Sequence, residues 1–84
     1  MNAQYITAST IIKFEDGYTD RGFGRFFDSY DVKQWACRYK RSSLHVKKHG
    51  KVTYMHVYLG DVQETIYLYD RESKTNYTNT EYYR

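Results

Sequence analysis

The sequence predicts a single α+β domain, in which an antiparallel sheet of about four or five strands carries one amphipathic helix on one face. Runs of alternating apolar and polar residues lie on both sides of one stretch with helical periodicity, and Asp-Gly and Gly-Asp pairs stand where hairpin turns are needed. A chain of 84 residues also has room for only one domain with a thin core. We assign residues 1–70 to this domain and expect residues 71–84 to form a flexible polar tail or an edge strand.

The first predicted element is a strand over residues 4–14, where β-branched residues dominate and side chains alternate between two faces. The Asp-Gly pair that follows tolerates the positive φ angles of a tight turn, so a second strand should run back to residue 27. Gly22 and Gly24 in this strand are typical of a bulge or of a close approach by another backbone. We expect the three phenylalanines near its end to be core residues: Phe23, Phe26 and Phe27.

A helix is predicted between Asp31 and Ser42, because the apolar residues there recur with the period of a helix. Asp31 is the expected N-terminal cap, with Gln34 as its capping-box partner. The apolar stripe, which should face the sheet, comprises Val32, Trp35, Ala36 and Tyr39. The opposite side should carry Lys33, Cys37, Arg38, Lys40 and Arg41.

Three more strands are expected after the helix, over residues 44–49, 52–59 and 62–70. A two-residue Gly-Asp turn between the last two would pair Leu59 with Val62 and place Tyr54 opposite Tyr67. One face of this hairpin is then apolar. The other face is predicted to carry Tyr54, His56, Tyr58, Tyr67 and Tyr69.

Positive charge is concentrated in the middle of the chain. The segment Val32–Gly60 contains seven Lys or Arg residues and no acid, whereas each flanking segment contains three basic and five acidic residues, which gives the net charge of +3. The seven cations are Lys33, Arg38, Lys40, Arg41, Lys47, Lys48 and Lys51. Such a patch predicts contact with the phosphates of RNA or another nucleic acid, or with an acidic protein surface. The alternative is a solvated helix face that keeps the protein soluble.

The row of tyrosines has three interpretations. Exposed aromatic rings on a sheet can stack on unpaired bases, and a basic edge beside them would follow the nucleic-acid backbone. The same rings are typical of protein interfaces. Tyrosine is also an ordinary β-former, and cross-strand pairs stabilise hairpins without any ligand.

The segment from Arg21 to Phe27 reads Arg-Gly-Phe-Gly-Arg-Phe-Phe. Its first four positions resemble the start of the ribonucleoprotein signature of RNA-recognition motifs. It then departs from that signature, because Arg25 stands where an aromatic residue belongs. No helix is predicted before it, whereas that family carries the signature on its third strand. We therefore do not assign the chain to that family.

No catalytic, metal-binding or cofactor-binding motif is present, and we expect a non-enzymatic protein without cofactors. His45, His49, His56 and Cys37 lack the paired close spacings of a zinc site. A small nuclease that uses these histidines is the weakest alternative. The single cysteine excludes an internal disulfide and predicts a reducing, cytoplasmic setting. No apolar run approaches the ~20 residues of a membrane helix, so no membrane contact is expected.

In length, single-cysteine usage, tyrosine content and sheet-plus-helix pattern, the chain resembles the small proteins that bacteriophages make to disable host defences, including antitoxin-like and anti-CRISPR proteins. The resemblance implies an inhibitor that acts in the host cytoplasm and transfers no functional residue. We therefore expect an RNA-binding or nucleic-acid-binding protein that neutralises a host nuclease or ribonucleoprotein. The alternative is a pure protein–protein inhibitor that binds an acidic surface of a host defence protein. An unpaired edge strand could also give a homodimer.

Overall fold

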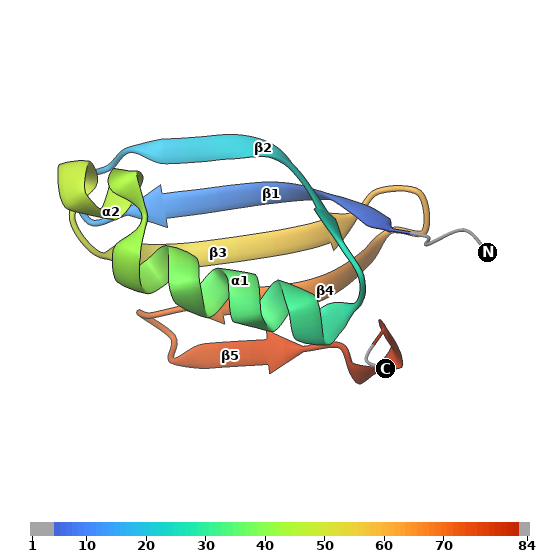
Figure 1. Cartoon of the computed structure of the whole chain (residues 1–84). Coiled ribbons are helices and arrows are strands. Elements are labelled where there is room, and N and C mark those ends of the chain that lie inside the picture. The colour runs from blue at the N-terminus through green and yellow to red at the C-terminus, as the bar shows by residue number, and fades with distance from the viewer. Residues whose placement is uncertain (1–4, 83–84) are drawn as a thin grey trace.

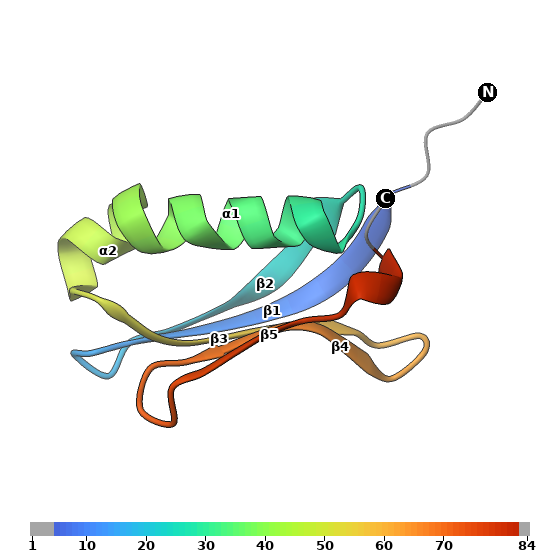
Figure 2. The same cartoon turned by 90° about the horizontal axis from the view of Figure 1, so that it is seen from below.

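The computed structural model describes residues 5–82 and confirms the α+β fold class. Five antiparallel strands form one sheet in the order β2-β1-β3-β4-β5. The elements are β1 (Ile6–Phe14), β2 (Thr19–Phe26), α1 (Ser29–Ser42), α2 (Leu44–His49), β3 (Val52–Leu59), β4 (Glu64–Asp70), β5 (Thr75–Thr78) and a 3-10 turn, η1 (Thr80–Tyr82) (Figure 1). Figure 2 shows both α-helices on the same side of the sheet, and within residues 5–82 no helix covers the other face. Within residues 5–82, no helix is long and apolar enough to cross a membrane.

The predicted N-terminal hairpin is present. Gly17 takes the positive φ of 96° that its turn requires, and its N–H donates to the carbonyl of Phe14 at 3.0 Å. The pairing of β1 with β2 is regular, so neither glycine of β2 marks a bulge. At Gly24 a side chain, not a backbone, comes close: an added Cβ would lie 2.7 Å from the ring of Phe26.

The N-terminal cap of helix α1 lies three residues earlier than predicted. Asp28, not Asp31, is the N-terminal cap, and its carboxylate accepts a hydrogen bond from the Asp31 N–H at 2.9 Å. Asp31, rather than Gln34, reaches back from the first turn, and its carboxylate accepts from the N–H of Phe27, the residue before the cap, at 3.0 Å. The apolar period identified the buried face correctly but did not reveal the first turn, whose Tyr30 side chain is exposed.

The predicted strand over residues 44–49 is wrong, because this segment is the short helix α2. Ser43 caps it by accepting a hydrogen bond from the Val46 N–H at 3.1 Å, and Gly50 ends it with a φ of 90°. An alternation of apolar and polar residues over only six positions cannot distinguish a strand from a helix of about one and a half turns. The capping serine and the glycine after the last residue were the signals that favoured a helix.

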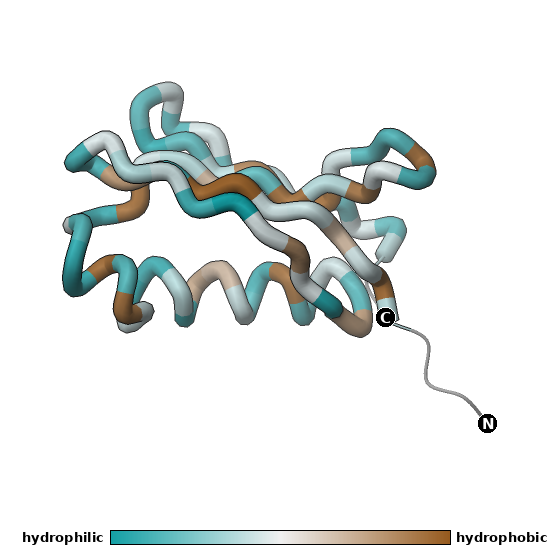
Figure 3. The backbone as a smooth tube through the Cα atoms, turned by 90° about the horizontal axis from the view of Figure 1, so that it is seen from above, coloured by the Kyte–Doolittle hydropathy of each residue, from teal (hydrophilic) through white to brown (hydrophobic). Residues whose placement is uncertain are grey.

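The core lies between α1 and one face of the sheet. The predicted stripe of α1 is confirmed: Val32 and Ala36 are fully buried, while Trp35 and Tyr39 pack partly buried against the core. The sheet contributes Ala8, Ile12, Phe14, Met55, Val57, Ile66 and Tyr67, among others. Figure 3 shows hydrophobic residues concentrated in the central strands and alternating with hydrophilic ones along the helices.

The predicted register of β3 and β4 is wrong. The connection is a four-residue turn over residues 60–63, in which Gln63 takes a φ of 52°, so Leu59 pairs with Glu64. A bulge between Val57 and Tyr58 shifts the pairing by one further residue. Tyr67 consequently pairs with Val57, whose side chain points to the core. Because alternate residues face opposite sides of a sheet, this shift of three moves two tyrosines of β4 to the helix side.

Candidate functional site

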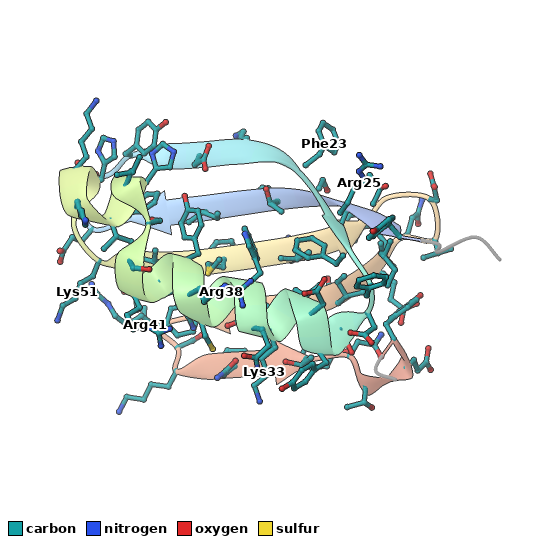
Figure 4. The ribbon with its side chains drawn as sticks, viewed as in Figure 1. Phe23, Arg25, Lys33, Arg38, Arg41 and Lys51 are labelled. Carbon is teal, nitrogen blue, oxygen red and sulfur yellow. The ribbon has the colours of Figure 1, made fainter. Side chains whose placement is uncertain are left out.

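The predicted basic patch lies on the helix side of the molecule. Lys33, Arg38 and Arg41 project from α1, Lys47 and Lys48 from α2, and Lys51 lies just before β3; all six are exposed. Figure 4 shows Lys33, Arg38, Arg41 and Lys51 spread along α1 and beyond its C-terminal end. The patch is therefore separated from the tyrosines of β3 by the thickness of the sheet and helix, and the two features do not form one surface.

Lys40, the seventh predicted patch residue, points toward the sheet. Its Nζ donates to the Tyr67 hydroxyl at 3.0 Å and lies 3.7 Å from the centroid of the Tyr69 ring. Burial lowers the pKa of Lys40 and raises the pKa of Tyr67 to about 12. Tyr67 is only 1% exposed. The expectation that Tyr67 and Tyr69 share the tyrosine row is wrong. The side chains of Lys40, Tyr67 and Tyr69 instead form a packed cluster under α1.

The open face, which we define as the sheet face that no helix covers, gathers a different set of residues. The pairing places Phe23 of β2, Ser9 of β1 and Tyr58 of β3 in one row across the sheet. The complete aromatic and basic set from β1, β2 and β3 is Lys13, Arg21, Phe23, Arg25, Tyr54, His56 and Tyr58. Three members of the predicted tyrosine row are thus retained, and four further residues join them.

Phe23 is the most exposed large hydrophobic residue of this face, at 84%, so its assignment to the core is wrong. Phe27 is also exposed, and only Phe26 enters the core, where its ring meets Trp35 edge-on at 5.3 Å. Alternation along β2 explains the difference, since positions 21, 23 and 25 face outward and position 26 ends the strand facing inward. Phe23 therefore adds an exposed aromatic ring to the open face, between Arg21 and Arg25 on the same side of β2.

The cations of the open face were missed because they belong to a segment with excess acid. Lys13, Arg21 and Arg25 are exposed, and within residues 5–82 none of them forms an ion pair with a carboxylate. The Lys13 ammonium lies 5.3 Å from the centre of the Tyr54 ring. The nearby acids are used elsewhere: Glu15, for example, accepts a hydrogen bond from the Lys51 N–H at 2.7 Å. The alternating positions 21, 23 and 25 were the signal available in the sequence.

His56 lies in the middle of the open face. Its Nε2 is 2.8 Å from the hydroxyl of Thr65, and burial lowers its pKa, which favours the neutral ring at physiological pH. Its strand neighbours are Ile11 on β1 and Leu68 on β4. The imidazole lies between the rings of Tyr54 and Tyr58, with centroid distances of 6.3 Å and 5.5 Å.

The other two histidines join α2 to the β1–β2 hairpin. His49 Nδ1 lies 2.8 Å from an Asp16 carboxylate oxygen, and the ring stacks on Tyr18 with centroids 3.9 Å apart. The hydrogen bond from the Tyr18 N–H and the contact with His49 lower the pKa of Asp16. His45 Nε2 lies 3.8 Å from Asp20. Across the described part of the chain, no three His, Cys, Asp or Glu side chains are grouped so that they could hold a metal ion.

A groove of about 540 Å³ adjoins the open face at the end of the sheet where β1 begins. Thr7 and Ser9 of β1 form its floor, Phe23 lies on one side, and residues 60–62 of the β3–β4 turn lie on the other. Its size falls within the ~300–1,000 Å³ typical of small-molecule sites.

Comparison of the chain with models of protein families, with curated proteins and with solved structures finds no match. The function of the protein is therefore inferred from the chemistry of its surface.

Proposed function

We propose that this chain is a non-enzymatic protein that binds single-stranded RNA across the open face of its sheet. One observation carries the proposal: the open face combines the exposed ring of Phe23 and the partly buried rings of Tyr54 and Tyr58 with three cations that form no ion pair within residues 5–82. Asp70 is the single acid among the strand residues of this face, and its carboxylate accepts hydrogen bonds from the backbone N–H groups of Glu72 and Ser73.

A single strand fits this surface better than a duplex. Bases can stack on Phe23, Tyr54 and Tyr58 only when their faces are free, and each stacked base contributes ~1–3 kcal/mol. The cations Lys13, Arg21 and Arg25 stand among these rings, where the phosphates of the same strand would pass. In a double helix the bases are stacked on one another and cannot reach the rings.

The salt dependence of binding distinguishes the open face from the helix-side patch. For a single strand, the slope of log K against log salt is about −0.7 for each phosphate neutralised, so three open-face cations give a slope of about −2. The six exposed helix-side cations would instead give about −4. The two surfaces can thus be told apart by one titration of the unmodified protein.

The direct test compares two double variants by fluorescence anisotropy with a labelled single-stranded RNA. Arg21→Gln with Arg25→Gln removes two open-face cations, and Lys47→Gln with Lys48→Gln is the matched control on α2. We expect the first to weaken binding and to make the slope shallower by about 1.4, while the second changes neither. If only the α2 pair weakens binding, the open face is not the RNA site.

The inhibitory role implied by the resemblance to phage-encoded inhibitors has a consequence of its own. RNA held on the open face is shielded from a nuclease, so the protein should protect a labelled strand from ribonuclease digestion. The Arg21→Gln, Arg25→Gln variant should give no protection at the same concentration. Equal protection by this variant would show that shielding does not arise from the open face.

A protein target is the second candidate, favoured by the outer edge of β2. No strand among residues 5–82 pairs with this edge, and Arg21 and Arg25 flank it, so an extended acidic segment of another protein could add to the sheet. Under this alternative the protein binds no RNA even at low salt and captures an acidic peptide instead.

A further inference from the structure

We propose that the groove beside Phe23 is a nucleobase pocket that selects a base carrying an exocyclic amino group. This inference rests on the proposed function, because it names the part of the RNA that the open face reads. The Phe23 ring supplies an exposed flat wall, and the small side chains of Thr7 and Ser9 leave space below it. A planar ring that stacks on Phe23 therefore enters the groove edge first, with its polar edge toward the floor and the β3–β4 turn.

Two polar side chains that line the groove, those of Ser9 and Asp61, present hydrogen-bond acceptors to a ligand. The Ser9 hydroxyl already donates to the Tyr58 carbonyl at 3.3 Å, so its oxygen is left as an acceptor. Asp61, on the β3–β4 turn opposite Phe23, contributes a carboxylate, which can only accept when ionised. Cytosine presents an amino group to such acceptors, whereas uracil presents a carbonyl oxygen at the same position.

A cation near the groove could contact the phosphate of a nucleotide whose base stacks on Phe23. Arg25 pairs across the strands with Thr7 of the floor, and its guanidinium lies 5.8 Å from the centre of the Tyr5 ring, which lines the groove. Figure 4 shows Arg25 next to Phe23 on β2. A nucleotide whose base stacks on Phe23 therefore has its phosphate within reach of a cation, while Asp61 lies on the opposite side of the groove.

The experiment is an NMR titration of the ¹⁵N-labelled full chain with cytidine monophosphate and, as the matched ligand, uridine monophosphate. We expect saturable shifts at the amides of Thr7, Ser9, Phe23 and Asp61, with the cytidine nucleotide binding at least about fivefold more tightly. Ribose 5-phosphate, which has no base, should leave these amides unchanged.

Two variants make the assignment specific. Phe23→Ala should abolish the shifts, whereas Tyr77→Ala, which removes an exposed ring on β5 that does not line the groove, should preserve them. Asp61→Asn keeps the shape but adds a donor, so the preference for cytidine over uridine should disappear. Phe23 and Tyr77 are both exposed, so either variant should fold.

The outcomes separate this inference from the function on which it rests. If a single-stranded RNA shifts the open face while neither mononucleotide shifts the groove, or both bind equally, the base pocket is refuted and RNA binding stands. If the cytidine nucleotide binds selectively but no RNA binds, the pocket is supported and the RNA proposal fails. If nothing binds, both are refuted.

Discussion

Replacing Lys40 with methionine tests whether this lysine is a structural residue or a member of the cationic surface. The Lys40→Met variant keeps the aliphatic stem under α1 and removes the ammonium that contacts Tyr67 and Tyr69. Lys33→Met is the matched control, because Lys33 lies on the same helix with its side chain exposed. The two substitutions change the net charge equally, so charge alone cannot separate their effects.

The expected loss of unfolding free energy in Lys40→Met follows from the two contacts that the ammonium makes. A hydrogen bond from a charged donor contributes ~1.5–3 kcal/mol, and a cation over an aromatic ring contributes ~0.5–2 kcal/mol. Partial burial of the ammonium opposes these gains, as the lowered pKa of Lys40 indicates. We therefore expect Lys40→Met to lose about 1–3 kcal/mol of unfolding free energy, while Lys33→Met changes it by less than about 0.5 kcal/mol.

The assay is urea unfolding followed by circular dichroism, combined with RNA binding measured on the same samples. Lys40→Met should unfold at lower urea with an unchanged slope and should bind RNA as tightly as the unmodified protein when folded. Unaltered stability together with weakened RNA binding would refute the packed cluster, and would return Lys40 to the polyanion-binding surface.

Two further predictions concern the sheet. Burial lowers the pKa of His56 below its usual 6.5. As the pH falls, the unfolded chain therefore takes up a proton at this histidine before the folded chain does. The stability that the neutral ring contributes is complete above about pH 6.5 and declines as the pH approaches the pKa of the folded state. His56→Gln should remove this part of the pH dependence in urea-unfolding curves recorded between about pH 7.5 and 5, and identical pH profiles for the two proteins would contradict the assignment. Gly24→Ala should lower the melting temperature, because the added methyl group would lie 2.7 Å from the buried ring of Phe26, at a cost of ~1–3 kcal/mol. Gly22→Ala is its control, since the nearest atom there is 3.8 Å away; equal melting temperatures would mean that the Phe26 ring yields freely.

Periodicity predicted those parts of the fold that local sequence determines. The apolar stripe of α1 and the first hairpin follow from spacings within a few residues, and both are confirmed. The predicted register of the β3–β4 hairpin was wrong because the register depends on the length of one turn and on a bulge. The Gly-Asp pair indicated a turn but not that it would extend to Gln63, and a displacement of three residues reverses the faces.

The candidate site was predicted only in part, because its cations are scattered along the sequence and come together only when the strands pair. Tyr54, His56 and Tyr58 were identified correctly as one row, since they alternate on a single strand. Their basic companions come from β1 and β2, and no local count reveals which strands become neighbours. Lys40 illustrates the converse, since a lysine at the border of a helical stripe can turn its stem inward and place its ammonium on aromatic rings.

The strand order also determines how the molecule assembles. The sheet consists of two locally built units, the β1–β2 hairpin and the β3–β4–β5 meander, which meet along one seam between β1 and β3. The pairing of β1 with β3 joins residues as distant in sequence as Ile11 and His56, and pairing between distant residues slows folding. Phe23 belongs to the first unit and Tyr58 to the second, so the open face exists only after the seam has closed. A ligand that lies across the open face would therefore bind both units at once, stabilise their pairing and slow their separation.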